Sequence, residues 1–320
     1  MREAMARAEV GDEQRKLDPT VNELQERVAE LLGQEEALYL PSGTMCNAIS
    51  YRLHLRPGGD EVILDRTAHP IVAEAGSPGG FSGAMTYQLD SRHGIFTGED
   101  VRGALRPAGD RYAPRSRLVS VEQTTNIAGG HVWPLDTMQG VLNVAREHEL
   151  RTHLDGARLM NAVVASGVRA ADYAGGFDTA WLDFTKGLGA PVGACLAASS
   201  ELIEEAWRWK QMIGGSLRQA GIIAAAGLFA LDNNVERLAE DHANARALAE
   251  GLAALPGVSV DPAEVETNIV IFEVEDGPAW AHSAEEKGVE LLALDATHVR
   301  AVTHMDVSRE DIDRALELLA

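Results

Sequence analysis

Helix-like and strand-like segments alternate along the first 200 residues, and this alternation restricts the fold more than any other feature of the sequence. A helical pattern over residues 20–33 precedes the first strand-like run, and a second helix starts at Ser42-Gly43-Thr44 after that run. Strands that alternate with helices pack into a mostly parallel sheet with helices on both faces. We therefore expect an α/β fold with strands near 37–40, 61–64, 117–121, 152–155, 180–184 and 193–198.

The pattern changes in the last third of the chain. Residues 201–252 read as helices interrupted at Gly214-Gly215, and a final helix is expected at about 308–319. Between them lie short strand-like runs, which indicate a separate α+β unit. We expect a large domain of residues 1–224 and a smaller C-terminal domain of residues 225–320, with strands of the latter near 258–260, 268–272, 289–292 and 299–302.

The charge balance narrows the class of partner. The sequence has 28 basic and 49 acidic residues and a formal net charge of -21, which disfavours nucleic acids and anionic membranes as partners. The two cysteines, Cys46 and Cys195, do not form a disulfide framework or a metal-type spacing, so a reducing cytoplasm is expected. No apolar run is long enough to span a membrane, and the first residues do not resemble a signal peptide.

Two residues at predicted strand ends carry the chemistry. Asp155 ends one apolar strand in His153-Leu154-Asp155, and Lys186 follows another and begins a glycine-rich loop. A lysine that forms a Schiff base and an aspartate that keeps a pyridine nitrogen protonated are what pyridoxal 5'-phosphate requires. Taken singly, the aspartate could be a helix cap and the lysine an exposed loop residue. Their combination favours the cofactor site.

Further residues could complete such a site. Ser42, Gly43 and Thr44 open a helix after a strand, where free backbone N–H groups and hydroxyls can bind a phosphate. His69 follows the next strand and could stack on a flat ring or move a proton, with Glu74 to orient it. The same residues could equally be an ordinary helix cap and a surface histidine.

Three arginines could bind anionic groups. Arg158 lies one helical turn after Asp155, and Arg218 follows the Gly214-Gly215 pair. Arg300 sits in an apolar strand, where a guanidinium needs a partner or an exposed edge. Salt bridges on the surface remain the alternative for Arg218. We expect no metal site, because the ten histidines are scattered and form no HxxxH or HExxH spacing.

The chain resembles the low-specificity L-threonine aldolases, which are pyridoxal phosphate enzymes of the aspartate-aminotransferase-like class, fold type I. The matching stretches run in family order along the whole chain, and the lysine loop and the HLDGAR run are the most specific of them. They are residues 18–24, 41–45, 153–159, 186–193, 214–221 and 303–307.

The resemblance implies a role for each candidate at the cofactor. Lys186 would carry the Schiff base, Asp155 would face the pyridine nitrogen and His69 would stack on the ring. Gly43 and Thr44 would hold the phosphate.

The resemblance also implies how the substrate is bound. Arg158 and Arg300 would bind its carboxylate, and Thr125 would lie near its β-hydroxyl. Arg218 would approach the cofactor, from the same chain or from a neighbouring subunit. Enzymes of this kind are dimers or tetramers with sites at the dimer interface, so a homo-oligomer is expected.

Three departures from the family pattern concern the substrate rather than the cofactor. The family has a Ser-Asp-Thr-x-Thr segment before the stretch at which this chain begins, so a serine contact to the substrate carboxylate is expected to be missing. The family's Glu-Asn-Thr-His-Asn reads Glu122-Gln123-Thr124-Thr125-Asn126 here, so Thr125 replaces a histidine. A family tyrosine is absent from Gly11-Asp12-Glu13-Gln14-Arg15.

The expected activity is retro-aldol cleavage of a β-hydroxy-α-amino acid to glycine and an aldehyde. Lys186 and Asp155 would serve the cofactor. The candidate base is His69, directly or through water, and a water bound to the cofactor phosphate is the alternative. The departures leave two alternatives open: a different reaction with the same cofactor, namely β-elimination, dehydration or transamination, and an inactive binding or assembly partner.

Overall fold

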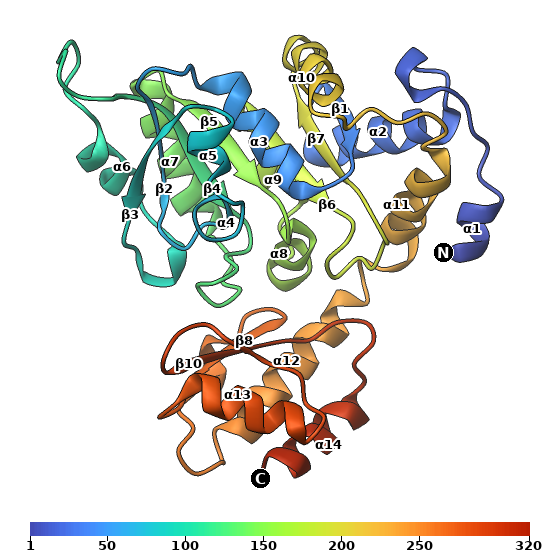
Figure 1. Ribbon diagram of the computed structural model, residues 1–320, viewed down its shortest axis with the longest axis vertical. Helices are drawn as coiled ribbons and strands as arrows, with labels where there is room; N and C mark the ends of the chain where they lie inside the picture. The colour runs from blue at the N-terminus through green and yellow to red at the C-terminus, as the bar shows by residue number, and fades with distance from the viewer.

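The computed structural model describes all 320 residues and contains one large sheet and one small sheet (Figure 1). The large sheet has seven strands in the order β1-β7-β6-β5-β4-β2-β3. Strands β2 to β6 run parallel to their neighbours, whereas β7 is antiparallel to both β6 and β1. The bounds are β1 Glu36–Leu40, β2 Asp60–Asp65, β3 Met85–Leu89, β4 Arg115–Glu122, β5 Arg151–Asp155, β6 Thr179–Asp183 and β7 Ala194–Ala198.

Helices cover both faces of this sheet, as the alternating pattern predicts. Alternate residues of the strands enter different cores: Leu154 and Leu182 pack with α2 and α7, whereas Trp181 and Leu196 pack with α3 and α10. The helices of this part are α1 Arg2–Ala6, α2 Pro19–Leu32, α3 Gly43–His54, α4 His69–Val72, α5 Ser77–Gly80, α6 Gly98–Ala104, α7 Leu135–Glu147, α8 Leu159–Ser166, α9 Ala170–Ala174, α10 Ser200–Met212 and α11 Gly221–Asn233.

Local sequence signals account for the ends of these helices. In α2, the Asp18 carboxylate accepts a hydrogen bond from the backbone N–H of Val21, and Pro19 is the first helical residue. Gly33 ends the helix at φ 66°, a left-handed conformation that glycine adopts without a steric penalty. Leu24 and Val28 are fully buried on one side of α2, in agreement with the predicted apolar stripe.

The small sheet lies in a separate lobe below the large one in Figure 1. Its three antiparallel strands are β8 Ile269–Glu273, β9 Leu292–Ala293 and β10 His298–Val302, in the order β8-β10-β9. A hydrophobic core of its own is formed with α12 Leu238–Leu252, α13 Gly277–Glu286 and α14 Arg309–Leu319. Three short 3₁₀ turns complete the chain: η1 Glu13–Arg15, η2 Arg92–Gly94 and η3 Pro262–Glu264.

The structure corrects several predicted strands. Residues 258–260 form only an isolated bridge from Ser259 to Glu273, and the strand expected at 289–292 is the two-residue β9. The sequence pattern does not predict β3, because this edge strand has exposed and half-buried residues and lacks the apolar run of an inner strand. The expected domain boundary at residue 224 falls inside α11, which packs against α1 and α2.

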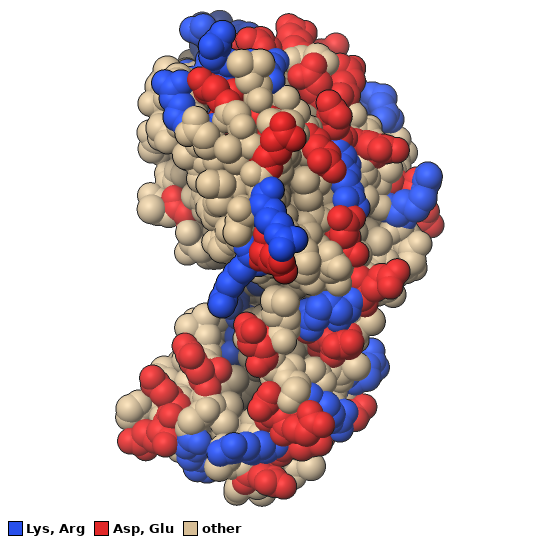
Figure 2. All heavy atoms as spheres, turned by 90° about the vertical axis from the view of Figure 1, so that its right-hand side faces the viewer, with Lys and Arg blue, Asp and Glu red and all other residues tan.

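The surface carries charges of both signs. On the face shown in Figure 2, acidic side chains are spread over both lobes and basic ones lie among them. None of the helices combines the length and the apolar character needed to cross a membrane.

Candidate active site

One pocket brings together most of the candidate residues. It has a volume of about 280 Å³ and lies where β1, β5 and β6 end. In open α/β sheets this edge, at the carboxyl ends of parallel strands, is where ligands bind. Seven of the predicted residues line it: Ser42, Gly43, Thr44, His69, Asp155, Arg158 and Lys186.

The start of α3 forms one wall of the pocket. Ser42 caps the helix, and its hydroxyl accepts a hydrogen bond of 3.2 Å from the backbone N–H of Met45. A side chain at Gly43 would overlap the ring of Trp181, so glycine is needed here to bring the backbone and the indole together. The positive end of α3 is therefore open to an anionic group.

Asp155 occupies the end of β5 and is almost fully buried, with 1% of its surface exposed. One carboxylate oxygen accepts a hydrogen bond of 2.8 Å from the Asn47 amide, and the other accepts one of 3.0 Å from the backbone N–H of Ala157. Burial raises the pKa of Asp155 to about 6, and the hydrogen bond from Asn47 opposes that rise. The carboxylate is thus ionised at neutral pH, although it lies out of contact with water.

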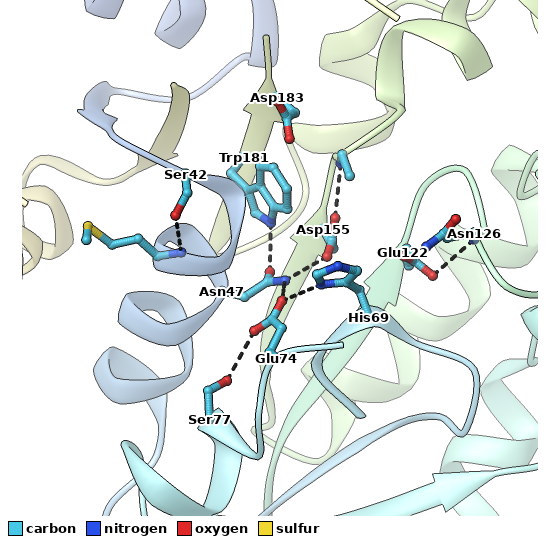
Figure 3. Close-up of polar contacts among 12 residues, drawn as sticks. Ser42, Asn47, His69, Glu74, Ser77, Glu122, Asn126, Asp155, Trp181 and Asp183 are labelled. Atoms are coloured by element: carbon cyan, nitrogen blue, oxygen red, sulfur yellow. Dashed lines mark hydrogen bonds and ion pairs between the residues drawn. The ribbon is translucent and has the colours of Figure 1, made fainter. Parts of the chain in front are cut away.

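Asn47 connects Asp155 to the rest of the site (Figure 3). Its amide nitrogen donates to Asp155 and, at 2.7 Å, to Glu74. Its amide oxygen accepts from the indole N–H of Trp181 at 2.8 Å and lies 2.9 Å from Nε2 of His153. Because an indole N–H can only donate, the amide orientation is determined, and both N–H groups point at carboxylates.

His69 begins α4 and faces the same pocket. Its Nδ1 lies 2.7 Å from Oε1 of Glu74, whose other oxygen accepts a hydrogen bond from the Ser77 hydroxyl. The hydrogen bond with Glu74 raises the pKa of His69, and partial burial opposes this effect. With Nδ1 donating to Glu74, Nε2 is the nitrogen that can accept a proton.

Lys186 follows β6 in the loop that leads to β7. Its Nζ lies 3.4 Å from a carboxylate oxygen of Asp183, and 41% of the side chain is exposed. Asp183 is itself buried and accepts hydrogen bonds from the backbone and the hydroxyl of Thr185. Lys186 therefore lines the pocket with its amine in one long contact to a carboxylate.

A second buried carboxyl group, Glu122 at the end of β4, also lines the pocket. Oε2 accepts a hydrogen bond of 3.3 Å from the backbone N–H of Asn126, and Oε1 has no partner. Burial and the neighbouring negative charge of Asp155 raise the pKa of Glu122 well above its usual range. The buried Arg158 guanidinium opposes that rise, while burial lowers its own pKa.

Arg300, Thr125 and Arg218 do not line the pocket. Arg300, on β10 of the small sheet, donates a hydrogen bond of 2.9 Å to the side chain of Asn126 and so lies beside the Glu122 end. Thr125 is buried, and its hydroxyl accepts a hydrogen bond from the backbone N–H of His131. Arg218 is 62% exposed and pairs with Asp12.

Sequence reasoning did not select Asn47, Trp181 or Glu122 as functional residues. The i+3 spacing of Asn47 from Thr44 on α3 and the position of Glu122 at a strand end are signals that could have found two of them. The indole of Trp181 gives no such signal, since an aromatic residue in a buried strand is typical of any core.

The fold and the site define the class of protein. A mostly parallel seven-stranded sheet with helices on both faces, a small C-terminal sheet, and a lysine and an aspartate at neighbouring strand ends are the architecture of the aspartate-aminotransferase-like class, fold type I. The chain belongs to the beta-eliminating lyase family, whose sequence model matches residues 1–275.

Similar proteins agree with this assignment. The low-specificity L-threonine aldolase 1 of Arabidopsis thaliana is 36% identical over 99% of this chain and 90% of its own length. The low-specificity L-threonine aldolase of Escherichia coli strain K12 is 38% identical over 98% of this chain and 92% of its own length. The threonine aldolase structure of Leishmania major matches 95% of this chain and 89% of its own chain, with a TM-score of 0.81 and 21% identity, and supports the fold.

Proposed function

We propose that this protein cleaves β-hydroxy-α-amino acids of the L-threonine and L-allo-threonine type to glycine and an aldehyde, with pyridoxal 5'-phosphate as cofactor. The single observation that carries the proposal is that Lys186, Asp155, His69 and the start of α3 line one pocket. Relatives that bear the name threonine aldolase match almost the whole chain and support the same reaction.

The residues of the pocket fit this cofactor. The N-terminus of α3 with Ser42, Gly43 and Thr44 would hold its phosphate. Trp181 packs so closely against Gly43 that any larger residue would close the cradle. When bound, the cofactor supplies an aldehyde for amines and a protonated ring that withdraws electrons.

The chain's own residues prepare the reaction. The Lys186 amine is the group that binds the cofactor, and the Asp155 carboxylate keeps a negative charge where the pyridine nitrogen would lie. Asn47 fixes that carboxylate by hydrogen bonding. His69 accepts the proton of the substrate β-hydroxyl at Nε2, while Glu74 stabilises the resulting imidazolium through Nδ1.

Two arginines would bind the substrate carboxylate. Arg158 lines the pocket and is 8% exposed, so its charge acts in a poorly hydrated environment. Arg300 extends from the small sheet and donates a hydrogen bond to Asn126, whose backbone N–H in turn donates to Glu122. The Nε of Arg300 is buried without a hydrogen-bond partner. An incoming carboxylate would satisfy that N–H group.

The decisive experiment measures aldehyde and glycine release from L-allo-threonine and L-threonine with added pyridoxal phosphate. We expect release by the unchanged protein and none by Lys186→Ala, with Lys287→Ala, an exposed lysine remote from the pocket, as a control that keeps full activity. Release that survives in Lys186→Ala would contradict the proposal. The ratio of the two substrates gives the preference at Cβ.

The second candidate is another reaction with the same cofactor. It is favoured because Thr125 is not among the residues that line the pocket, so the substrate β-hydroxyl lacks the contact expected from Thr125. Elimination or dehydration would release a keto acid and ammonia in place of glycine, and transamination would release a keto acid and leave the amino group on the cofactor. Product analysis in the same assay separates these cases. An absorption spectrum unchanged by added cofactor would indicate an inactive homologue.

The assembly, location and domain organisation are parts of the same proposal. We propose a homodimer or homotetramer, supported by the exposed Arg218, which would complete a neighbouring subunit's site. Light scattering after size exclusion tests this.

The two buried free cysteines support a reducing cytoplasm. The two separate cores support a large cofactor domain and a small C-terminal domain, divided after α11 rather than within it.

A further inference from the structure

Three side chains from distant parts of the sequence meet outside the active-site pocket. His93 lies in η2, His131 lies in the loop before α7, and Glu264 lies in η3, which leads to β8 of the small sheet. One ligand atom from each residue lies within 4.8 Å of the others. Nε2 of His93 is 3.0 Å from Oε2 of Glu264, and the two imidazole centroids are 3.8 Å apart. Two imidazoles and a carboxylate are a ligand set that zinc-like cations prefer.

His131 is oriented in the way that metal-binding histidines usually are. Its Nδ1 lies 3.0 Å from Oε1 of Glu266, and the other oxygen of Glu266 accepts a hydrogen bond of 2.8 Å from the backbone N–H of Val132. A carboxylate on one ring nitrogen fixes the tautomer and leaves the lone pair on the other nitrogen, Nε2. The His131 side chain is only 6% exposed, so this orientation is held by packing as well.

The surroundings of the cluster suit a bound cation. The three side chains line a pocket of about 330 Å³ together with apolar residues that include Ile127, Ile269 and Ile271. Apolar walls weaken the competition from water for the cation and strengthen its attraction to the carboxylate.

Arg92 contacts two of the three residues and would compete with a cation for them. Its Nε lies 2.8 Å from Nε2 of His93, and its guanidinium donates a hydrogen bond of 3.1 Å to Glu264. The Arg92 side chain is 79% exposed, so it can move into solvent without leaving a buried charge behind. A metal ion that binds here has to displace Arg92, and removal of this side chain is therefore expected to strengthen metal binding.

We propose that His93, His131 and Glu264 bind a divalent transition-metal cation of the zinc type, with Glu266 as the outer partner of His131. Three protein ligands leave a fourth position to water. The cation would join the segment before β8 to two loops of the large sheet, and so stabilise the contact between the two lobes. This proposal is independent of the reaction proposed above.

The experiment uses tag-free holoenzyme that has been treated with a chelator and then titrated with Zn²⁺ against a chromophoric competitor. We expect one Zn²⁺ per chain and a thermal unfolding temperature that rises with Zn²⁺. His93→Ala and Glu264→Gln should each weaken binding by at least about 10-fold, and Glu266→Gln by roughly 10- to 100-fold. Arg92→Ala should bind more tightly than the unchanged protein.

His282→Ala is the matched control, because His282 is exposed and its ion pair, with Glu286 at 3.7 Å, lies on α13 and not in the cluster. Its Zn²⁺ affinity should equal that of the unchanged protein. Circular dichroism and pyridoxal phosphate absorbance confirm that each variant is folded. The proposal is overturned if the unchanged protein binds no stoichiometric Zn²⁺, or if His93→Ala and Glu264→Gln bind it equally well.

Discussion

Asp155 and Glu122 are neighbours in the same sheet, yet their surroundings affect their pKa values differently. They are paired in register at the ends of β5 and β4, and 1% and 6% of their surfaces are exposed. Asp155 accepts hydrogen bonds from Asn47 and from a backbone N–H group, whereas Glu122 accepts one long hydrogen bond and leaves Oε1 without a partner.

The consequence is a division of roles between two buried carboxyl groups. The pKa of Asp155 is raised only to about 6, so Asp155 is ionised at pH 7. Burial and the neighbouring charge of Asp155 raise the pKa of Glu122 well above its usual range, which favours its neutral form. Burial is similar in both, but hydrogen bonds from Asn47 and Ala157 favour the charged form of Asp155, and the charge of Asp155 in turn adds to the rise at Glu122. A negative charge is therefore more favoured at the end of β5 than at the end of β4.

The largest effect is expected when the charge of Asp155 is removed. Asp155→Asn preserves the shape of the side chain but cannot keep a pyridine nitrogen protonated, so kcat for aldehyde release should fall by roughly 10²- to 10³-fold. Asp172→Asn, at a half-buried aspartate that pairs with Arg169 at the surface, is the control. An Asp155→Asn enzyme with unchanged kcat would show that the ionised form of Asp155 is not required.

The raised pKa of Asp155 also predicts how stability depends on pH in the cofactor-free protein. The native state binds more protons than the unfolded state between the unfolded pKa of 3.8 and the folded value of about 6. The free energy of unfolding should therefore fall as pH rises from about 4 to 6, by about 3 kcal/mol. Urea unfolding of the unchanged protein and of Asp155→Asn across this range measures the contribution. Parallel pH curves would contradict it.

Removing the Asn47 side chain should bring the hydrogen bonding and the pKa of Asp155 closer to those of Glu122. Asn47→Ala leaves one carboxylate oxygen of Asp155 and the indole N–H of Trp181 without a partner, and each such buried group costs about 1–3 kcal/mol. The pKa of Asp155 should rise, because the hydrogen bond that favours its charged form is lost. Chemical unfolding and a pH titration of cofactor absorbance measure the two effects. Asn143→Ala, an exposed asparagine on α7, should change neither.

These differences show which parts of the site can be predicted from sequence. Asp155 and Lys186 could be located because each follows a short apolar strand, and the ends of parallel strands meet at one edge. The start of α3 could be located from Ser42 and Gly43, since capping is local. Such signals lie within a few residues of the side chain that they identify.

The remainder depends on contacts that are distant in sequence. Asn47 meets Asp155 across 108 residues, because the packing of α3 on the sheet sets that contact. The ionisation of Glu122 depends on which donors fail to reach it, and no spacing pattern records an absent donor. For the same reason the scattered histidines predicted no metal site, although η2 and η3 bring His93 and Glu264 together.

The smallest change in stability is expected for a substitution of Glu122, the second carboxyl group of the comparison with Asp155. Glutamine resembles a protonated glutamate in shape and charge, so Glu122→Gln should change the free energy of unfolding by no more than about 0.5 kcal/mol at pH 7. Glutamine cannot transfer the carboxyl proton, so any loss of activity with unchanged stability would assign that proton to the reaction. A large destabilisation at pH 7 would instead mean that Glu122 is ionised and paired with Arg158. The two strand ends would then carry the same charge, and hydrogen bonding would not be what separates them.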